Sequence, residues 1–383
     1  MQNDRAAIAG DYADIVRTGP GTIAGRYMRS FWQPVAVSAE LPKGRAKPLR
    51  VMSEDFVLYR GESGAAQVLE PRCAHRCTQL STGWVEGDAL RCFYHGWMYD
   101  ASGQCVEAPA EREGYAATVK IRSYPTREYL GLIFVYLGEG EPPAFPRYRD
   151  LEDEGILESR LYFRDCNYFN NIENQADPVH VAFAHRRSAF TEGGLIGVPR
   201  VSAEETPWGI ALSAKREGVG VRVTQLGMPN ILHIKSSPTG PDAGWSDLFA
   251  WRVPIDDLSH LSFNIHLHRL KGEAAEKHRA RQAKRFAAGD GPARELAAAV
   301  RRGEIHIEEL KDHPGIVGIQ DDVAQLGQGA IADRVHERLG RSDVGIMLIR
   351  TIWLREMKAF AAGKPNKAWE WRADLAATVG VDA

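Results

Sequence analysis

The sequence has little of several features that mark specialised classes of protein. Its 383 residues include only five cysteines, too few and too scattered for a disulfide framework. The formal net charge of −2 gives no general attraction to nucleic acid. The longest apolar run, 132–137, is far shorter than the roughly 20 residues of a membrane-spanning helix, and no apolar signal-peptide core follows Met1. We therefore expect a soluble, cytoplasmic protein that binds neither nucleic acid nor a membrane.

The length of the chain and the distribution of its predicted strands and helices indicate two domains. Hydrophobic residues at 44% and charged residues at 26% are ordinary for a globular protein with a buried core. Residues 1–30 form an N-terminal arm, and 31–140 contain short strands divided by turns, which is typical of a small all-β domain. A Pro- and Gly-rich stretch, 138–146, marks the boundary to a second domain over 141–383.

The second domain mixes both kinds of secondary structure. Helices are predicted over 167–184, 273–288, 304–310 and 343–362, and strands alternate between about 208 and 270. The helix at 273–288 is rich in Ala, Lys, Arg and Glu, and we interpret its charges as a solvated face. The fold class is therefore α+β, with a larger antiparallel sheet flanked by helices.

Two cysteines and two histidines form the first candidate site. Cys73 is followed two residues later by His75, and Cys92 is followed three residues later by His95. Zinc also accepts two Cys and two His, so residue types alone do not decide the metal. A zinc finger usually takes both cysteines from one knuckle, whereas here each loop offers one Cys and one His. This order favours a [2Fe–2S] cluster with two cysteines on one iron and two histidines on the other.

The neighbouring residues fit a cluster site. Gly83 and Gly96 permit tight loops, and Tyr94 and Trp97 can supply a polar donor and an apolar shield. The other cysteines carry no motif. Cys77 is interpreted as a small buried residue rather than a spare ligand, and Cys105 and Cys166 as inert thiols.

A second group of ligand-type residues lies in the predicted helix at 167–184. Asp177 and His180 are three residues apart and share a helical face, whereas His185 lies about 140° further round an ideal helix. Both imidazoles reach one ion only if the helix ends or bulges between them, and Pro178 places a helix start close to Asp177. Taken alone, the two histidines could equally be partly buried structural residues.

These motifs resemble those of the Rieske non-haem iron oxygenases. Cys73–His75 and Cys92–Trp97 are similar to that family's C-x-H and C-x-x-H-G-W, and 27–35 resembles the entry to its Rieske domain. Asp177, His180 and His185 match its D-x-x-H-x-x-x-x-H. The resemblance implies a Rieske [2Fe–2S] domain, a helix-grip-like catalytic domain, and Fe(II) held by two histidines and a carboxylate. It also implies that Asp177 bridges His180 to a cluster histidine, His95, of a neighbouring subunit.

The third iron ligand must be a distant carboxylate. Aligning 328–331 with the M/Q-G-x-I of the phthalate-dioxygenase-like branch places its ligand aspartate on Asp321, and Asp322 is the next choice. Adjacent helical residues point about 100° apart, so only one of the two can face the iron. The other candidate carboxylates are Asp312, Asp333 and Asp343. We expect Asp333 to form a salt bridge with the adjacent Arg334, and Asp343 to cap a helix.

The resemblance also implies an activity. We expect the oxygenase component of the phthalate-dioxygenase-like or aromatic O-demethylase branch, which uses O₂ to hydroxylate or oxidatively demethylate a small aromatic acid or aryl ether. No G-x-G-x-x-G follows a predicted strand, so electrons must come from a separate NAD(P)H-dependent reductase, with or without a ferredoxin. The family implies a head-to-tail homotrimer. Alternatives are N-demethylation, ring dihydroxylation, a zinc-stabilised protein, or an electron-transfer protein without oxygen chemistry.

The substrate contacts are less defined by the sequence. We expect pocket walls from strands around 226–233 and 249–268 and from the helix that carries the two histidines. Arg186, Arg187 and Arg252 could bind a substrate carboxylate, but an exposed position is expected for each.

Overall fold

The computed structural model describes residues 12–186, 197–236, 244–288, 291–372, 374 and 377–380. The chain divides into two compact units. The smaller unit comprises Arg17–Phe145 and Val253–Asp256, and the larger unit contains the other described residues. The expected N-terminal arm is thereby divided, because 17–30 belong to the smaller unit and 12–16 to the larger one.

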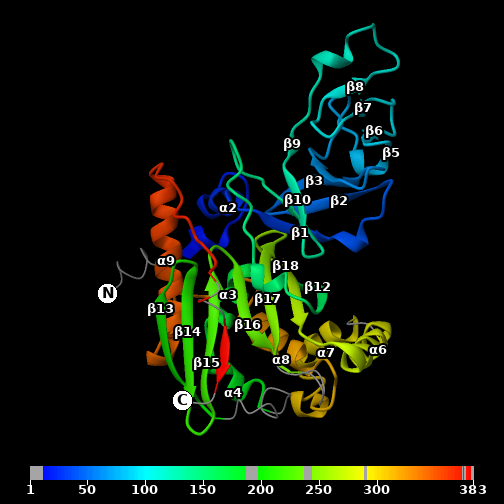
Figure 1. The fold of residues 1–383 in the computed structure, drawn as a ribbon. Coiled ribbons are helices and arrows are strands. Elements are labelled where there is room, and N and C mark those ends of the chain that lie inside the picture. Colours follow the sequence, from blue (N-terminus) through cyan, green and yellow to red (C-terminus); the bar gives the residue numbers. More distant parts are fainter. Residues whose placement is uncertain are drawn as a thin grey trace. The chain divides into compact units, whose positions relative to one another are not determined.

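The smaller unit is built from short antiparallel strands, coloured blue to cyan in Figure 1. One helix, α2 (Ile23–Arg29), precedes them, capped by the Thr22 side chain. Three sheets follow, with strand orders β1-β11-β10, β2-β3-β4-β9 and β5-β6-β7-β8. The strands are β1 (Gln33–Val37), β2 (Arg45–Val51), β3 (Glu54–Arg60), β4 (Ala66–Leu69), β5 (Trp84–Glu86), β6 (Ala89–Arg91), β7 (Met98–Tyr99), β8 (Cys105–Glu107), β9 (Ser123–Tyr124), β10 (Thr126–Tyr129) and β11 (Leu132–Val135).

The larger unit is organised around one sheet with the strand order β12-β18-β17-β16-β15-β14-β13. A short strand, β19, pairs with β15 outside that path. The pairing is antiparallel, for example between β12 and β18 and between β14 and β15. The strands are β12 (Ile156–Arg164), β13 (Arg200–Glu205), β14 (Gly209–Arg216), β15 (Gly220–Gly227), β16 (Ile231–Ser236), β17 (Ser246–Pro254), β18 (His260–His268) and β19 (Thr378–Gly380).

Helices flank this sheet, and α9 lies along β13 and β14 (Figure 1). Its Trp353 is fully buried and packs edge-on against Tyr168 and Phe169 of α3. The helices are α3 (Tyr168–Gln175), α4 (His180–Phe183), α6 (Gly272–Ala288), α7 (Gly291–Arg302), α8 (Ile316–Gly327) and α9 (Val344–Ala361).

The two faces of the sheet carry different side chains, because alternate residues of a strand point to opposite faces. On one face, Phe249 and Trp251 pack with Tyr148 and Trp208 in an aromatic core. The opposite face lines a cavity with alternate residues from several strands. These are Leu212, Ala214 and Arg216 of β14, Arg222 and Thr224 of β15, Leu232 and Ile234 of β16, Leu248 and Arg252 of β17, and Asn264 and His266 of β18.

The predicted helix at 167–184 is interrupted. Asn167 accepts a hydrogen bond from the Phe169 amide at the start of α3, which ends at Gln175. The next helix begins at His180, after a turn that contains Pro178. Proline has no amide hydrogen to donate and restricts the residue before it, so the chain leaves the helix before it resumes. A helix therefore does start close to Asp177, as Pro178 predicts, and α4 ends at Phe183, between the two histidines, but the prediction of a single helix over 167–184 was wrong.

Candidate metal centres

The Cys–His group of the smaller unit lies on two tight loops. In the first loop, the Cys77 amide donates to the Cys73 carbonyl at 2.9 Å. In the second, the Gly96 amide donates to the Cys92 carbonyl at 3.1 Å, and Gly96 has a φ of +75°, which glycine adopts without strain. The Cys73 and Cys92 side chains are buried and free of disulfides. The two loops bring the His75 and His95 rings to a centroid separation of 4.5 Å.

Two observations fit these four residues to an iron–sulfur cluster. The His75 Nδ1 atom is buried and has no hydrogen-bond partner, which suits a nitrogen whose lone pair binds a metal. Burial raises the pKa of Cys73, and a hydrogen bond from Tyr99 opposes this by stabilising the thiolate. The loops therefore present two sulfur and two nitrogen donors in the order expected for a Rieske cluster.

Aromatic side chains surround the loops. Trp97 stacks on the His75 ring with a centroid separation of 4.7 Å and an interplanar angle of 7°. The Tyr99 hydroxyl lies 3.2 Å from Cys73 Sγ and accepts a hydrogen bond from the Ala74 amide. Tyr99 was not singled out in the sequence; it lies in β7, two residues after Trp97. Tyr94 packs instead against the His95 ring.

The prediction for Cys77 was wrong. Its side chain is exposed rather than buried, and its φ of +58° lies in the left-handed region that favours glycine. The loop backbone at this position therefore has a conformation that glycine adopts more easily than cysteine, and the thiol is exposed to solvent. Cys105 and Cys166 are buried free thiols, and burial raises the pKa of both.

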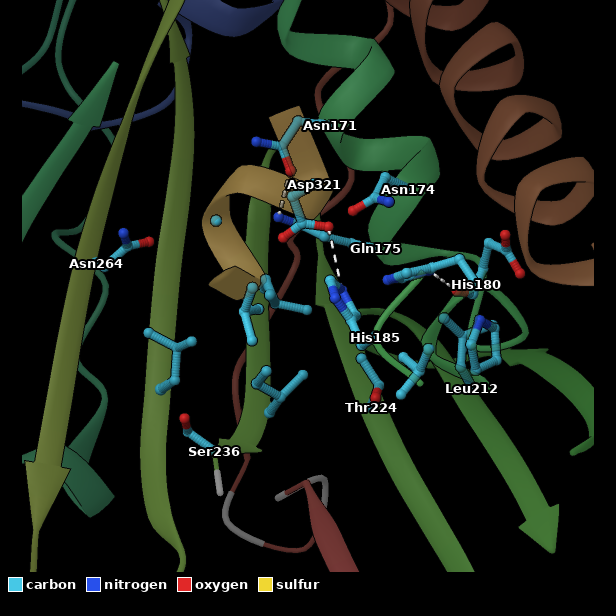
Figure 2. A pocket seen from close by; sticks show the side chains of 18 of the residues that line it. Asn171, Asn174, Gln175, His180, His185, Leu212, Thr224, Ser236, Asn264 and Asp321 are labelled. Carbon is cyan, nitrogen blue, oxygen red and sulfur yellow. Dashed lines mark hydrogen bonds and ion pairs between the residues drawn. The ribbon is translucent and has the colours of Figure 1, made fainter. Parts of the chain in front are cut away.

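In the larger unit, His180, His185 and Asp321 each place a ligand-type atom within 4.8 Å of the other two. His180 begins α4, His185 lies two residues beyond its end, and Asp321 projects from α8. His185 Nε2 is 3.4 Å from Asp321 Oδ1, as the dashed line in Figure 2 shows. Two imidazoles and a carboxylate in this arrangement form the donor set of a non-haem Fe(II) site with open positions.

Both histidines are held at their Nδ1 atoms. The His180 Nδ1 atom contacts the main-chain carbonyl of Asp177. The His185 Nδ1 atom lies 2.9 Å from the Gln320 side-chain oxygen. Gln320 was not singled out in the sequence, although its place directly before Asp321 on a helix was a usable signal.

The charges around Asp321 favour its ionised form. Burial alone raises the pKa of this carboxyl, but the hydrogen bond from His185 and the charges of His185 and Arg164 outweigh that effect. The pKa of Asp321 falls to about 2 as a result. The group is therefore an anionic oxygen donor at neutral pH.

The neighbouring Asp322 binds side chains of β12 through hydrogen bonds. One of its oxygens accepts from Arg164 Nε at 2.7 Å, and the other accepts from the Tyr162 hydroxyl. Asp322 is thus turned away from the histidines, as expected for adjacent helical residues.

The other aspartate candidates are not near the histidine pair. Asp312 and Asp333 are exposed, and Asp343 accepts from the Gly340 amide at 2.6 Å in a capping turn. Asp333 pairs with His336 rather than with Arg334, which binds Glu173.

Asp177 lines the same cavity as the histidines. Its carboxylate accepts a hydrogen bond from the Val179 amide at 2.9 Å, so the contact with His180 runs through the main chain and not through the side chain. The carboxylate holds the turn between α3 and α4, which sets the direction of the first histidine.

The cavity beside the three donors has a volume of about 310 Å³. Figure 2 shows it between the α3 and α8 side and the sheet, with Leu212, Thr224 and Ser236 on the strands. The predicted wall strands contribute Leu232, Arg252, Asn264 and His266, but β12, β14 and β15 also contribute and were not predicted.

The expectation that Arg252 is exposed was wrong. Arg252 is 6% exposed, lines the cavity, and donates to Asn264 Oδ1 at 2.9 Å. Burial and the nearby charge of Arg164 lower its pKa to about 9. Arg186 is exposed as expected and pairs with Glu308, while Arg187 lies outside the described residues.

A second buried guanidinium at the cavity wall belongs to Arg216. It donates to the main-chain carbonyls of Gly197 and Pro178, and burial lowers its pKa. The same wall contains the apolar residues Leu212, Leu232 and Leu248, and a third buried guanidinium, that of Arg222 on β15, whose pKa is lowered to about 10 by burial. The cavity thus combines metal donors, cationic groups and an apolar surface.

No helix among the described residues has the length and apolar composition needed to cross a membrane.

Comparisons with known proteins agree with this architecture. A family model described as the Rieske [2Fe-2S] domain matches residues 31–125. The chain is 31% identical over 379 residues to the 5,5'-dehydrodivanillate O-demethylase oxygenase subunit of Sphingobium sp. (strain NBRC 103272 / SYK-6), over 96% of this chain and 82% of the relative. It is 34% identical over 364 residues to the phenoxybenzoate dioxygenase subunit alpha of Ectopseudomonas oleovorans, over 88% of this chain and 81% of the relative.

The fold is shared with solved structures. The oxygenase in the reduced complex between oxygenase and ferredoxin in carbazole 1,9a-dioxygenase matches with a TM-score of 0.64 at 20% identity, over 88% of this chain and 93% of that chain. These findings do not favour the zinc-stabilised or electron-transfer alternatives. The chain belongs to the family of Rieske-type oxygenase subunits, and is thus an oxidoreductase that carries a Rieske [2Fe–2S] cluster and a mononuclear iron.

Proposed function

We propose that this chain is the terminal oxygenase of a multicomponent system and hydroxylates or oxidatively demethylates an aromatic acid. The observation that carries this proposal is the cavity, in which buried arginines, among them Arg216, Arg222 and Arg252, and apolar side chains lie beside His180, His185 and Asp321. An aromatic ring suits the apolar wall, and a carboxylate suits the guanidinium groups. The names of the relatives, an O-demethylase and a phenoxybenzoate dioxygenase, support the same class.

The metal ligands follow from the donor sets. Cys73 and Cys92 would hold one iron of the cluster, His75 and His95 the other, and His180, His185 and Asp321 the mononuclear iron. When bound, the cluster supplies single electrons and the iron supplies the activation of O₂. The chain's own contribution is to orient the ligands, exclude bulk water and hold the substrate ring near the open positions.

The arginines give the substrate its orientation. The Arg252 guanidinium donates to the side-chain amide oxygens of Asn264 and, in that amide's satisfied orientation, of Gln175. Both groups are neutral, so the charge of Arg252 remains available to an anionic ligand. Burial makes that charge costly in the empty cavity, because a desolvated cation is poorly compensated by carbonyls and amides. A carboxylate that enters the cavity would offset this cost and fix one end of the substrate.

Electron transfer defines the proposed partners. A separate reductase, with or without a ferredoxin, would reduce the cluster, in line with the ferredoxin complex of the carbazole enzyme. Asp177 would serve as the bridge to His95 of a neighbouring subunit in a head-to-tail homotrimer, a ring that needs a closing heterologous interface. Native mass measurement tests the trimer, and Asp177→Asn should keep both metals while blocking turnover.

Product analysis tests the proposal directly. The holoenzyme is supplied with a surrogate reductase, O₂ and a panel of aromatic acids and methoxy-substituted aromatic acids. Formaldehyde release identifies demethylation, and a hydroxylated ring identifies ring oxidation. If no aromatic acid is turned over while an uncharged aromatic or aliphatic alcohol is, the proposed substrate class is wrong.

A matched pair of substrates isolates the role of Arg252. For Arg252→Gln we expect KM for the acid to rise about tenfold or more, because a charge-assisted hydrogen bond is worth roughly 1.5–3 kcal/mol. KM for the methyl ester of the same acid should change much less. Equal losses for acid and ester would mean that Arg252 does not recognise the carboxylate.

A further inference from the structure

The two histidines at the proposed iron site are held by different kinds of group. The Asp177 main-chain carbonyl holds His180 Nδ1 and is fixed by the turn between α3 and α4. A side chain, that of Gln320, contacts His185 Nδ1 at 2.9 Å. His185 also lies beyond the end of α4 at Phe183, so the regular helix does not fix its ring. The orientation of the second histidine therefore depends on a replaceable amide.

We propose that Gln320 is the positioning residue that sets the ring orientation and the tautomer of His185. This inference rests on the proposed function, because it takes His185 to be an iron ligand. The amide oxygen accepts the Nδ1–H, which leaves the Nε2 lone pair free to bind the metal. An imidazole whose other nitrogen is anchored in this way binds metal more tightly than an unanchored one.

The geometry on the metal side is consistent with that role. His185 Nε2 is 3.4 Å from Asp321 Oδ1, which is long for a charge-assisted hydrogen bond. Ligand atoms about 2.1 Å from one ion, at angles of about 90–110°, lie roughly 3.0–3.4 Å apart. Gln320 and Asp321 are consecutive on α8, so one helix would both supply a ligand and orient the neighbouring one.

Gln320 lines a second cavity, whose volume is about 240 Å³. Its wall also contains apolar residues, among them Val300 and Val323, and the charged side chains of Arg186, Glu308 and Lys311. The Gln320 side chain is itself buried, with 9% exposure. Because the atoms removed by Gln320→Ala correspond to a molecule of acetamide, this cavity offers a route by which the missing amide can be returned.

The test measures iron retention and not only turnover. Purified, iron-loaded Gln320→Ala is challenged with an Fe(II) chelator, while the absorbance of the Rieske cluster reports that the cluster is intact and circular dichroism reports that the chain is folded. We expect the dissociation constant of the mononuclear iron to rise about ten- to a hundredfold. Added acetamide should restore most of the loss, and Gln320→Glu, whose carboxylate can only accept, should retain iron as the wild type does.

A control lies on the same helix. Gln325 is a buried glutamine of α8 that donates to Asn174 and not to a histidine. Gln325→Ala should leave iron affinity unchanged and should not respond to acetamide. The nitrosyl complex of the ferrous protein gives a second readout, because a loosened His185 should alter its electron paramagnetic resonance spectrum in Gln320→Ala only.

The outcomes separate the two proposals. If His185→Ala retains its mononuclear iron, the proposed iron site is wrong. If His185→Ala loses iron but Gln320→Ala keeps it within about twofold of wild type, the positioning role is overturned. An iron loss in Gln320→Ala that neither acetamide nor Gln320→Glu restores would also overturn it, because the effect would then come from damaged packing.

Discussion

The two candidate metal centres differ in how the chain assembles them. The Cys–His group takes all its donors from Cys73 to His95, on two loops closed by their own backbone hydrogen bonds. The His–His–Asp group joins α4 and the turn after it to α8, so it exists only when α8 packs correctly. A local centre is encoded by residue spacing, whereas a distributed centre is encoded by tertiary packing. The Cys–His group should therefore lose its metal only when its own residues change. Metal binding by the His–His–Asp group should also depend on the groups that orient its side chains.

Loss of a cluster cysteine should have the largest effect. In Cys92→Ser we expect the visible absorbance of the cluster to disappear and the iron content to fall by about two per chain, because a hydroxyl replaces the thiolate ligand. The iron of the distributed centre should remain at about one per chain. Metal analysis and absorption spectroscopy on the purified variant measure both quantities.

Cys77→Ser is the matched control, because Cys77 lies in the first loop but exposes its side chain. It should keep full absorbance and full iron content. A bleached Cys77→Ser would show that the exposed thiol takes part in binding the cluster.

Substitutions at the two adjacent aspartates of α8 should have different effects, one on metal binding and the other on the stability of the fold. Asp321→Ala should lose the mononuclear iron and keep the cluster, because it removes the anionic donor beside His185. Asp322→Asn should retain iron but lower the free energy of unfolding by about 3 kcal/mol, since it leaves the buried Arg164 guanidinium with a weakened partner. Iron analysis and denaturant unfolding distinguish the two, and the reverse pattern would move the ligand to Asp322.

A third group contains residue types that bind metals, but an arginine side chain already supplies its positive charge. Glu158, His268 and His278 lie within 4.8 Å of one another, yet Arg160 donates to the Glu158 carboxylate at 3.1 Å. Burial raises the pKa of Glu158, but hydrogen bonds from His268 and His278 outweigh it and lower the pKa to about 2. We interpret the group as an ion cluster that attaches α6 to the sheet.

Its stabilisation should depend on pH with a defined sign. Since the folded-state pKa lies below the ordinary value of 4.5, the carboxylate stabilises the fold above pH 4.5, and this contribution declines as the pH falls toward 2. The shift corresponds to roughly 3 kcal/mol at neutral pH. The stability difference between wild type and Glu158→Gln should shrink from pH 6.5 to pH 3.5.

The smallest effect is expected at Tyr99. A hydrogen bond to a cluster sulfur stabilises the reduced, more negative state and so raises the reduction potential. Tyr99→Phe removes the hydroxyl that lies 3.2 Å from Cys73 Sγ. The potential of the Rieske cluster should fall, with the iron content unchanged, as measured by redox titration. An unchanged or higher potential would mean that this hydroxyl does not donate to the sulfur.

Much of the local structure could be predicted from the sequence. The spacing of Cys73, His75, Cys92 and His95 already selects one arrangement of donors on two loops, and Pro178 already implies that a helix starts near Asp177. These features depend on neighbours in the chain. The choice of Asp321 depended on a resemblance, because no local rule relates α8 to α4.

The features that were missed depend on strands meeting across the sheet. Arg252 is buried because its strand lies within the sheet and its side chain turns to the cavity face, which its own neighbours in sequence do not specify. For the same reason, the wall residues of β12, β14 and β15 were not found. The error at Cys77 has a different cause. Its positive φ, and not a contact with another residue, decides which residue type suits the position.

The buried arginines of the cavity have a thermodynamic consequence that does not depend on turnover. Any ligand that binds the folded state alone stabilises it in proportion to the logarithm of its concentration over its dissociation constant. An anion that compensates Arg252 and Arg216 would therefore raise the melting temperature, whereas its uncharged isostere would raise it less. Thermal shifts across a library of aromatic acids and esters could thus rank physiological ligands without a reductase and without any reaction taking place.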